Sequence, residues 1–400
     1  MSNINVNRRD FIKYIGGAAV GLGIGGAGYL SANSQVGTVT SELEQVKEEL
    51  KGRGHLGYVF GAEGSIATID LSRGKVLASS GTTWIADAGR VDWANHYPDK
   101  NGNVWGLGRS GGKATVYQVN PSTNEKLTEI PLEGAWRSAL AETDVDGKYG
   151  YFLNLLVAKI PDEQLLGARG EVENIASSDT ISPSIIYKVD LQSGKIVGEL
   201  EVPKFCCDVA IGPDNKLWTT NQLESLLTVI DTNSFTVEEH LAEEYSDWGG
   251  SMLTISPNND IAFIEVNSGA NWSIIDKDIF ANADGEEMVW DIKAKEIIKR
   301  FPLKDASPRT SEFTPDGRYV LVRTKPATIV YDTESLEEVT KIEIENSGDA
   351  IFSSDSSLAY VPNPGDSSLE VFEVGSFKKI NTIKLPFSPS KTVPVDLKKF

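Results

Sequence analysis

The segment Ser311–Ile344 reads SEFTPDGRYVLVRTKPATIVYDTESLEEVTKIEI, and its pattern decides the fold. An apolar strand leads into a Pro-Asp-Gly turn and a second strand, and a third strand ends in a V-x-D triplet before a fourth strand follows. Alternating apolar residues are typical of half-buried strands, and Asp-Gly favours a tight turn between two of them. The segment therefore predicts an antiparallel meander of four strands.

The same pattern recurs along most of the chain. A second clear copy is VAIGPDNKLWTTNQLESLLTVIDTNSFTVEEHL at Val209–Leu241, and the copy that begins at Leu253 reads LTISPNNDIAFIEVNSGANWSIIDKD. Further copies begin at His96, Glu142 and Ile351. One such unit cannot bury both of its faces, but units stacked radially can, and closing the ring protects the strand edges. Six full copies therefore indicate a radial repeat architecture.

A partial copy at the start of the repeats predicts how the ring closes. Gly57–Ser80 supplies the second, third and fourth strands of a unit but no first strand. The C-terminal segment SKTVPV, residues 390–395, stands where the other units begin their inner strand. The sequence therefore predicts an all-β fold in residues 55–400, a seven-bladed β-propeller of four-stranded antiparallel blades whose first blade is closed by residues 390–397.

The repeats are somewhat long for a propeller. Residues 57–397 give about 49 residues per blade, against the ~40–45 that are usual. We attribute the excess to two insertions, Lys159–Pro183 in the third blade and Phe280–Met288 in the fifth. The first of them would offer a lateral surface to a protein partner.

The N-terminus has the features of an export signal. Arg8 and Arg9 are followed by Phe11 and then by the weakly apolar run IGGAAVGLGIGGAGYL, residues 15–30. This arrangement resembles a twin-arginine signal. The resemblance implies export of the folded protein to an extracytoplasmic location, either the periplasm or the outer face of the cytoplasmic membrane. The apolar run, residues 15–30, is shorter than the ~20 residues that a spanning helix needs. Residues 1–34 are therefore interpreted as a cleaved signal or as a membrane tether.

Residues 35–54 are expected to form a stalk helix and linker. In TVTSELEQVKEELK, residues 38–51, the apolar residues Val39, Leu43, Val46 and Leu50 follow the spacing of a helical a/d seam. One or two heptads are too few to hold a coiled coil. A short stalk helix is therefore favoured over an oligomerisation zipper.

Composition excludes several classes of function. The formal net charge is −19, which disfavours nucleic-acid binding because that function needs a basic surface. Two cysteines exclude a disulfide framework and a Cys-rich metal site. The three histidines, His55, His96 and His240, leave little material for a His-based metal centre.

The repeats resemble the YVTN-type propellers of exported bacterial and archaeal proteins over nearly all of residues 57–397. A narrower resemblance joins Gly249–Val266, GGSMLTISPNNDIAFIEV, and the Ser311 repeat to the d-type haem propeller of cytochrome nitrite reductase and related haem-maturation proteins. That family has a histidine before the PEF-type strand, where this chain has Thr310, and a second one where Ile255-Ser256-Pro257 stands. The family's haem-ligand and proton-donor chemistry therefore does not carry over, and d-type haem remains only an alternative cofactor.

One end of the predicted inner strands gathers charged and aromatic side chains. Counting back from the first turn of each unit places there Arg90, Asp92, Trp93, Trp136, Arg137, Cys206, Cys207, Asp208, Trp248, Arg309, Asp349 and Lys391. Clustered guanidinium groups suit carboxylates or phosphates through bidentate bonds. Either the cations bind a small anionic ligand at the channel mouth, or Asp92, Asp208 and Asp349 pair with them as ties between blades. On the first interpretation the candidate ligand-binding residues are Arg90, Asp92, Arg137, Cys206, Cys207, Asp208, Trp248 and Arg309.

The adjacent pair Cys206-Cys207 allows three interpretations. Thiols on neighbouring strand residues would point to opposite faces as small apolar groups. A bond between them is geometrically strained, because adjacent Cα atoms are only ~3.8 Å apart. A metal or redox centre is the third interpretation. Oxygen-rich turns at Asp99-x-Asn101-x-Asn103 and Asp144-x-Asp146-Gly147 have calcium-like spacing, but ordinary turn chemistry explains them as well.

Three functions fit these observations. The first is an exported, non-catalytic propeller that binds protein partners or a small anion. The second is a redox or cofactor protein related to the d-type haem propellers, which the scarcity of histidine disfavours. The third is a lactonase-like hydrolase, which the lack of convergent acidic residues at equivalent positions disfavours. No nucleophile constellation can be assembled, because the histidines stand in distant blades, and no catalytic residue is assigned.

Overall fold

The computed structural model describes residues 56–61, 65–71, 73–80, 92–93, 98–110, 113–121, 123–132, 136–144, 146–156, 183–204, 206–221, 226–242, 250–267, 285–303 and 308–395. For a few strand residues in these ranges only the backbone is described. The segments predicted as export signal, tether and stalk helix, residues 1–54, lie outside the described residues. Within the described ranges no helix has the length and apolar character needed to cross a membrane.

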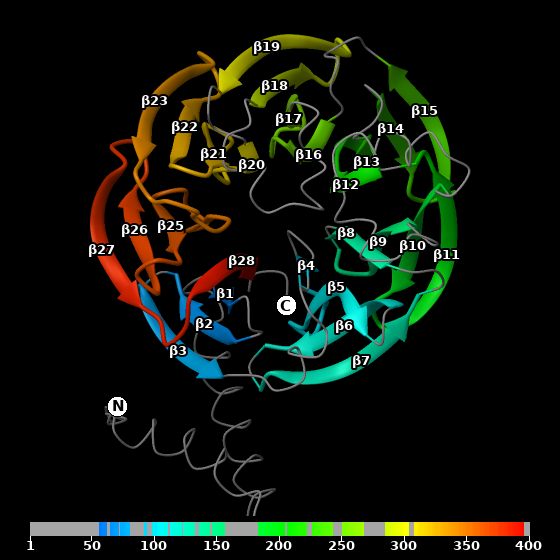
Figure 1. The fold of residues 1–400 in the computed structure, drawn as a ribbon, viewed down its shortest axis with the longest axis horizontal. Helices are drawn as coiled ribbons and strands as arrows, with labels where there is room; N and C mark the ends of the chain where they lie inside the picture. The colour runs from blue at the N-terminus through cyan, green and yellow to red at the C-terminus, as the bar shows by residue number, and fades with distance from the viewer. Residues whose placement is uncertain are drawn as a thin grey trace, which may run out of the picture. The chain divides into compact units, whose positions relative to one another are not determined.

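The described strands form seven antiparallel sheets of four strands, arranged as blades around one axis (Figure 1). This confirms the predicted seven-bladed propeller. Blades 1 to 3 contain, from the axis outward, β28 (Pro389–Val395), β1 (Leu56–Gly61), β2 (Ile66–Asp70) and β3 (Lys75–Ser80); β4 (Asp92–Trp93), β5 (Val104–Ser110), β6 (Lys113–Asn120) and β7 (Glu125–Pro131); and β8 (Trp136–Thr143), β9 (Tyr149–Leu156), β10 (Ser184–Asp190) and β11 (Lys195–Val202).

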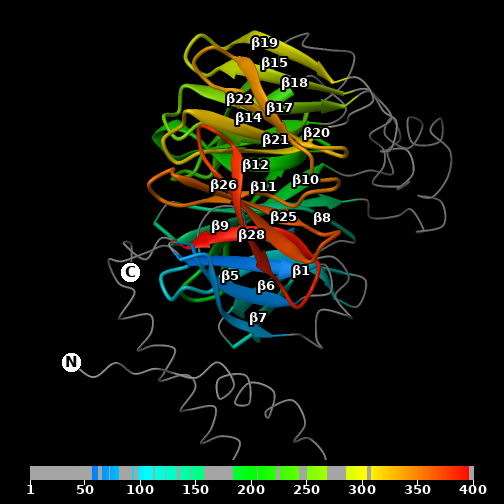
Figure 2. The same cartoon turned by 90° about the vertical axis from the view of Figure 1, so that its left-hand side faces the viewer.

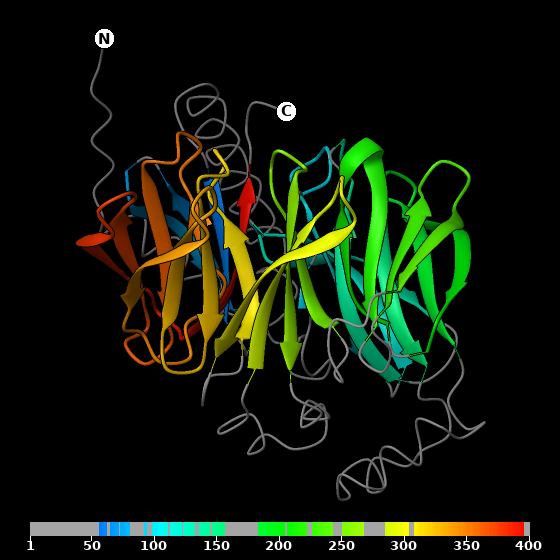
Figure 3. The same cartoon turned by 90° about the horizontal axis from the view of Figure 1, so that it is seen from above.

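The remaining four blades repeat this order. They contain β12 (Cys206–Ile211), β13 (Lys216–Asn221), β14 (Leu226–Asp231) and β15 (Thr236–Ala242); β16 (Gly250–Ile255), β17 (Ile261–Asn267), β18 (Gly285–Asp291) and β19 (Glu296–Leu303); β20 (Pro308–Phe313), β21 (Tyr319–Thr324), β22 (Thr328–Asp332) and β23 (Glu337–Ile342); and β24 (Ile351–Phe352), β25 (Leu358–Asn363), β26 (Ser368–Glu373) and β27 (Lys378–Lys384). In side view the strands run roughly along the ring axis (Figure 3).

The two ends of the described chain meet in blade 1. β28 pairs antiparallel with β1, with Leu56 opposite Val395 and Phe60 opposite Lys391, and the two strands lie side by side in both views (Figures 1 and 2). The inner strand of blade 1 thus comes from the C-terminal segment that the sequence singled out, and it spans Pro389–Val395 within the described residues.

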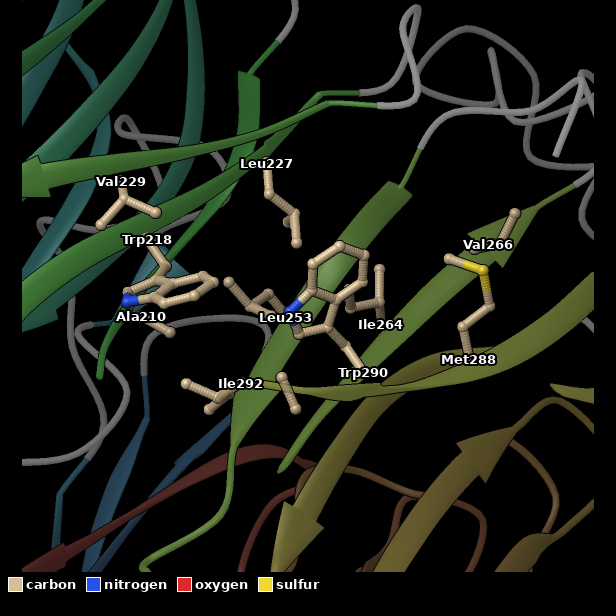
Figure 4. Packing of buried hydrophobic residues seen from close by; sticks show 11 residues of the cluster. Ala210, Trp218, Leu227, Val229, Leu253, Ile264, Val266, Met288, Trp290 and Ile292 are labelled. Atoms are coloured by element: carbon tan, nitrogen blue, oxygen red, sulfur yellow. The ribbon is translucent and has the colours of Figure 1, made fainter. Parts of the chain in front are cut away.

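The structure corrects the prediction for the third strand of blade 5. The copy read from Leu253 ended at Asp278, with an insertion placed at Phe280–Met288. Instead, β18 begins at Gly285 and supplies the third strand, with the sequence GEEMVWD. Met288 and Trp290 are fully buried against blade 4, so burial of these large side chains fixes the strand (Figure 4). The connection between β17 and β18 is therefore residues 268–284, which lie outside the described residues.

The cores lie between adjacent blades. Figure 4 shows one of them, in which Trp218 and Leu227 of blade 4 pack against Leu253, Ile264 and Trp290 of blade 5. Each sheet therefore buries both faces against its neighbours, as the radial repeat predicted.

The V-x-D signature of the repeats has a structural cause. The Asp side chain at the end of the third strand accepts the backbone N–H of the residue three positions on, as Asp190, Asp231 and Asp332 do from Ser193, Ser234 and Ser335 at 2.7, 2.7 and 2.9 Å. These bonds lower the pKa of all three carboxyl groups. The repeat signature is thus a turn cap, not a binding motif.

All seven outer strands have a register shift after their second residue. It leaves the third residue without a Cα partner: Leu77, Leu127, Val197, Glu238, Ile298, Val339 and Ile380. Five of these are exposed large apolar side chains, between 42% and 54% exposed. A bulge bends an edge strand and hinders pairing with a second chain, so the bulges protect the outer edges of the ring.

Candidate functional site

All inner strands begin at the same end of the ring, because every blade has four antiparallel strands and the next blade starts where the last one ends. We call this the proximal end. The backbone of four predicted site positions lies there: Asp92 begins β4, Arg137 is the second residue of β8, Cys206 begins β12, and Arg309 is the second residue of β20. The side chains of Asp92, Arg137 and Arg309 are not described. Arg90 and Trp248 lie outside the described residues.

A buried carboxylate joins blades 6, 7 and 1 at the proximal end. Asp349, which is 7% exposed, precedes β24. Arg323 Nη1 lies 2.6 Å from its Oδ1, and Lys391 Nζ lies 3.9 Å from its Oδ2. The Thr310 hydroxyl donates to Oδ1 at 2.9 Å, and the Thr392 hydroxyl donates to the Asp349 carbonyl at 2.7 Å. Two cations therefore share one carboxylate.

A second buried carboxylate joins blades 4 and 5. Asp208 is 2% exposed and lies where the register of β12 shifts between Cys206 and Val209. Its Oδ1 accepts the backbone N–H of Val209 at 2.7 Å, and its Oδ2 accepts that of Leu253 on β16 at 2.8 Å. The described contacts of Asp208 are thus two backbone donors, and whether it also pairs with an arginine, one of the two interpretations above, stays a prediction.

Burial raises the pKa of Asp208 to about 7, although the two backbone N–H groups and the charge of Lys391 act in the opposite direction. Glu142, which is also buried and accepts the Thr143 N–H at 2.8 Å, raises it further. Charges on β8, β12 and β28 thus act on one another around the axis. Within the described residues, the proximal end holds two cations, Arg323 and Lys391, and two buried acids, Asp349 and Asp208.

Cys206 is a buried thiol. It packs with Tyr151, Val209 and Leu217 in the core between blades 3 and 4. This is the environment of a small apolar side chain. The backbone of Cys207 lies in β12, and its side chain is not described.

The other sequence candidates have structural roles. Asp99 Oδ1 accepts the N–H groups of Asn101 and Asn103 at 2.8 and 3.0 Å, and its Oδ2 accepts Trp105 Nε1 at 2.9 Å. Asp144 Oδ1 accepts the Lys148 N–H at 2.7 Å. Both are turn residues, and the described part of the chain contains no group of three or more His, Cys, Asp or Glu that could hold a metal ion.

The site contains residues that the sequence analysis missed. Arg323 was overlooked because the search followed only the inner strands, whereas Arg323 lies on β21. The sequence does mark it, because Arg323 is a charged residue at the fifth position of the second strand. In five other blades that position holds an uncharged residue: Phe60, Gly108, Leu153, Thr220 or Pro362. Glu142 was also overlooked; it lies near the opposite end of β8 and acts on Asp208 through its charge.

The described residues include the position at which the haem family has its first histidine. Thr310 occupies it, and its hydroxyl donates to Asp349. A threonine engaged in this way offers no iron ligand. His240 is the only histidine in the described part of the chain, and it lies on outer strand β15, 3.0 Å from the Thr228 hydroxyl. Among the described residues, no histidine therefore stands where that family has its haem ligand.

Comparison with known proteins shows the fold. No family model and no curated protein matches the chain. Similar solved structures include Kuenenia stuttgartiensis hydrazine synthase, with 13% identity, a TM-score of 0.53, and coverage of 78% of this chain and 92% of that chain. A functionally unknown protein from Desulfotomaculum acetoxidans has 12% identity and a TM-score of 0.59, covering 85% and 98%. Dihydro-heme d1 dehydrogenase NirN in complex with DHE has 12% identity and a TM-score of 0.54, covering 84% and 74%. At such identities the likeness is one of architecture alone.

Proposed function

We propose that this protein is an exported, non-catalytic propeller that binds a small anion, a carboxylate or a phosphate, at the proximal end of the ring. The cations that would bind it are Arg323 and Lys391, with Arg137 and Arg309 at the starts of the inner strands of blades 3 and 6. Guanidinium groups suit these anions because their N–H groups match two oxygens at once.

The observation that carries the proposal is the unfinished hydrogen bonding of Arg323. Its side chain is 18% exposed, and Nη1 is engaged by Asp349. Its Nε is buried and has no hydrogen-bond partner among the described residues. A buried donor without an acceptor is costly, and the Asp349 carboxylate already serves Lys391 and Thr310. An incoming oxyanion that displaces the atoms covering Nε would supply the missing acceptor.

Addition of succinate or inorganic phosphate is expected to raise the melting temperature (Tm) in a saturable manner. At one hundred times Kd the stabilisation is about 2.7 kcal/mol, or roughly 4 °C for a ring of this size. Arg323→Ala should abolish the rise. The matched control is Arg318→Ala in the same blade, because Arg318 is 66% exposed and lies near Asp332 in a turn. The proposal fails if no anion gives a saturable shift, or if Arg323→Ala responds as the wild type does.

Export through a twin-arginine route is the second part of the proposal, and it rests on Arg8, Arg9 and Phe11 followed by the apolar run 15–30. Replacing Arg8 and Arg9 by Lys is expected to leave the precursor in the cytoplasm of an expressing bacterium. Cell fractionation followed by immunoblotting measures this, with a folded cytoplasmic protein as the fractionation control. Normal export of the double variant would exclude this route.

A further inference from the structure

Two buried glutamates face each other in blade 5. Glu265 on β17 and Glu287 on β18 are Cα partners, so their side chains share one face of the sheet, with Cβ atoms about 5 Å apart. They are 4% and 0% exposed. The next pair along the same face, Phe263 and Val289, packs into the core that contains Phe313 of blade 6. The two carboxyl groups therefore lie in the seam between blades 5 and 6.

Glutamate is out of place at position 287. In the other six blades the residue four positions before the end of the third strand is apolar or threonine: Ile66, Val116, Ile186, Leu227, Thr328 and Leu369. All six are buried, at 2% exposure or less. Blade 5 thus has a carboxyl group where the repeat has a core side chain. Burying an ionised carboxylate is costly unless it is paired.

The contacts of Glu287 suit the neutral acid. The Ser311 hydroxyl of β20 donates to its Oε1 at 2.8 Å. Its Oε2 is buried and has no hydrogen-bond partner among the described residues. Burial raises the pKa of Glu287 to about 8, and the Ser311 bond offsets only part of this effect. A proton on Oε2 would make it a donor, and Glu265, the Cα partner of Glu287 on β17, has its side chain on the same face of the sheet.

The charged groups around the pair do not compensate an ionised Glu287. On β22, burial raises the pKa of Tyr331, and the charges of Glu287 and of Glu338 on β23 raise it further. On β19 the residue opposite Glu287 is Phe301, and the Lys299 ammonium lies 5.7 Å from the centre of that ring. On β21, Arg323 is engaged by Asp349. The side chain of Arg309 on β20 is not described. No described cation forms an ion pair with Glu287.

We propose that Glu287, with Glu265 opposite it, is a proton-dependent latch between blades 5 and 6. Protonated, Glu287 bridges the two strands of blade 5 and holds Ser311 of blade 6. Ionised, it leaves a buried charge in the seam, and the seam loosens. The sign follows from linkage: a folded-state pKa near 8 exceeds the ordinary 4.5, so the native state binds the extra proton. The stabilisation is complete below about pH 4.5, falls as the pH rises, and is gone above about pH 8.

The latch is tested by the Tm of three full-length proteins across pH 5 to 9: wild type, Glu287→Gln and Glu286→Gln. Glu286 is the matched control because it is the adjacent residue on β18 and pairs with Arg300 outside the seam. Between pH 6 and 8 the wild-type Tm should fall by roughly 4 °C relative to Glu287→Gln. Glu286→Gln should follow the wild-type profile.

A second variant covers the case in which Glu287→Gln does not fold. Glu287→Leu installs the side chain that blades 4 and 7 have at this position, in Leu227 and Leu369. We expect Glu287→Leu to be more stable than the wild type at pH 8 and to lose the part of the pH-dependent fall that Glu287 contributes, while the part due to Asp208 remains. The latch is excluded if the folded Glu287 variants keep the wild-type slope, or if Glu286→Gln flattens it equally.

Discussion

Deletion of residues 388–400 is expected to abolish the native ring. The deletion removes β28, the inner strand of blade 1, and leaves β1 with an unpaired backbone edge at the axis. It also removes Lys391 and Thr392, which contact Asp349, and Ser390, whose hydroxyl donates to the Phe60 carbonyl at 3.1 Å. Because β1 is buried along its whole length, the exposed edge is apolar and prone to aggregation.

Size-exclusion chromatography and thermal unfolding measure this outcome. The control is deletion of residues 396–400, which lie beyond β28 and should be tolerated. The expected result is aggregation or loss of a cooperative transition for the longer deletion only. A monomeric truncated protein with the wild-type Tm would show that the ring does not depend on its closing strand.

The fold was predictable because its signals are local and repeated. The Asp-Gly turn at Asp316-Gly317 has a left-handed glycine, with φ of 73°, and the V-x-D triplets end in capping carboxylates such as Asp332. Such features recur in register with alternating apolar residues, so seven weak signals reinforce one another. Blade 5 was misread because both Ile275-Asp276 and Trp290-Asp291 fit the end of a third strand, and only packing against blade 4 selects the second.

Other features of the ring have no local signature. The residue before each outer strand has a left-handed backbone, with φ between 49° and 63°. At Gly74 and Gly194 the sequence predicts this, but Phe235 and Phe377 adopt it too. Both phenylalanines pack on the preceding blade. The ring centres of Phe235 and Tyr151 are 6.1 Å apart, and those of Phe377 and Tyr319 are 5.2 Å apart. Burial of an aromatic ring offsets the strain of ~1–2 kcal/mol, and this balance cannot be read from the turn itself.

The candidate site was predictable only in outline. Sequence reasoning placed Asp208, Asp349 and Lys391 at one end of the inner strands, and the strand topology brings these positions together. It did not foresee that Asp208 binds backbone N–H groups, because this depends on the register shift in β12. It also did not foresee Arg323, which reaches Asp349 from a second strand. Contacts made across blades depend on backbone register and cannot be read from one repeat.

Replacement of Asp349 by alanine is expected to cost about 3 kcal/mol, the lower end of the range for breaking a buried ion pair. The lower end applies because Arg323 and Lys391 are 18% and 15% exposed and water still screens them in part. A fall in Tm of roughly 4 °C follows for a ring of this size. Asp366→Ala, an exposed aspartate of the same blade whose carboxylate accepts a bond from Asn363, is the matched control and should have little effect.

The same variant tests whether the two cations can accept an external anion. Without Asp349, Arg323 and Lys391 lose the carboxylate that they share, and an acetate or formate ion has the group needed to replace it. We expect acetate to raise the Tm of Asp349→Ala more than that of the wild type or of Asp366→Ala, measured against chloride at equal ionic strength. A combined Asp349→Ala/Arg323→Ala variant should lose this response. If acetate stabilises all of these proteins equally, the cations at the proximal end serve only the architecture of the ring, because a general salt effect does not depend on which carboxylate was removed.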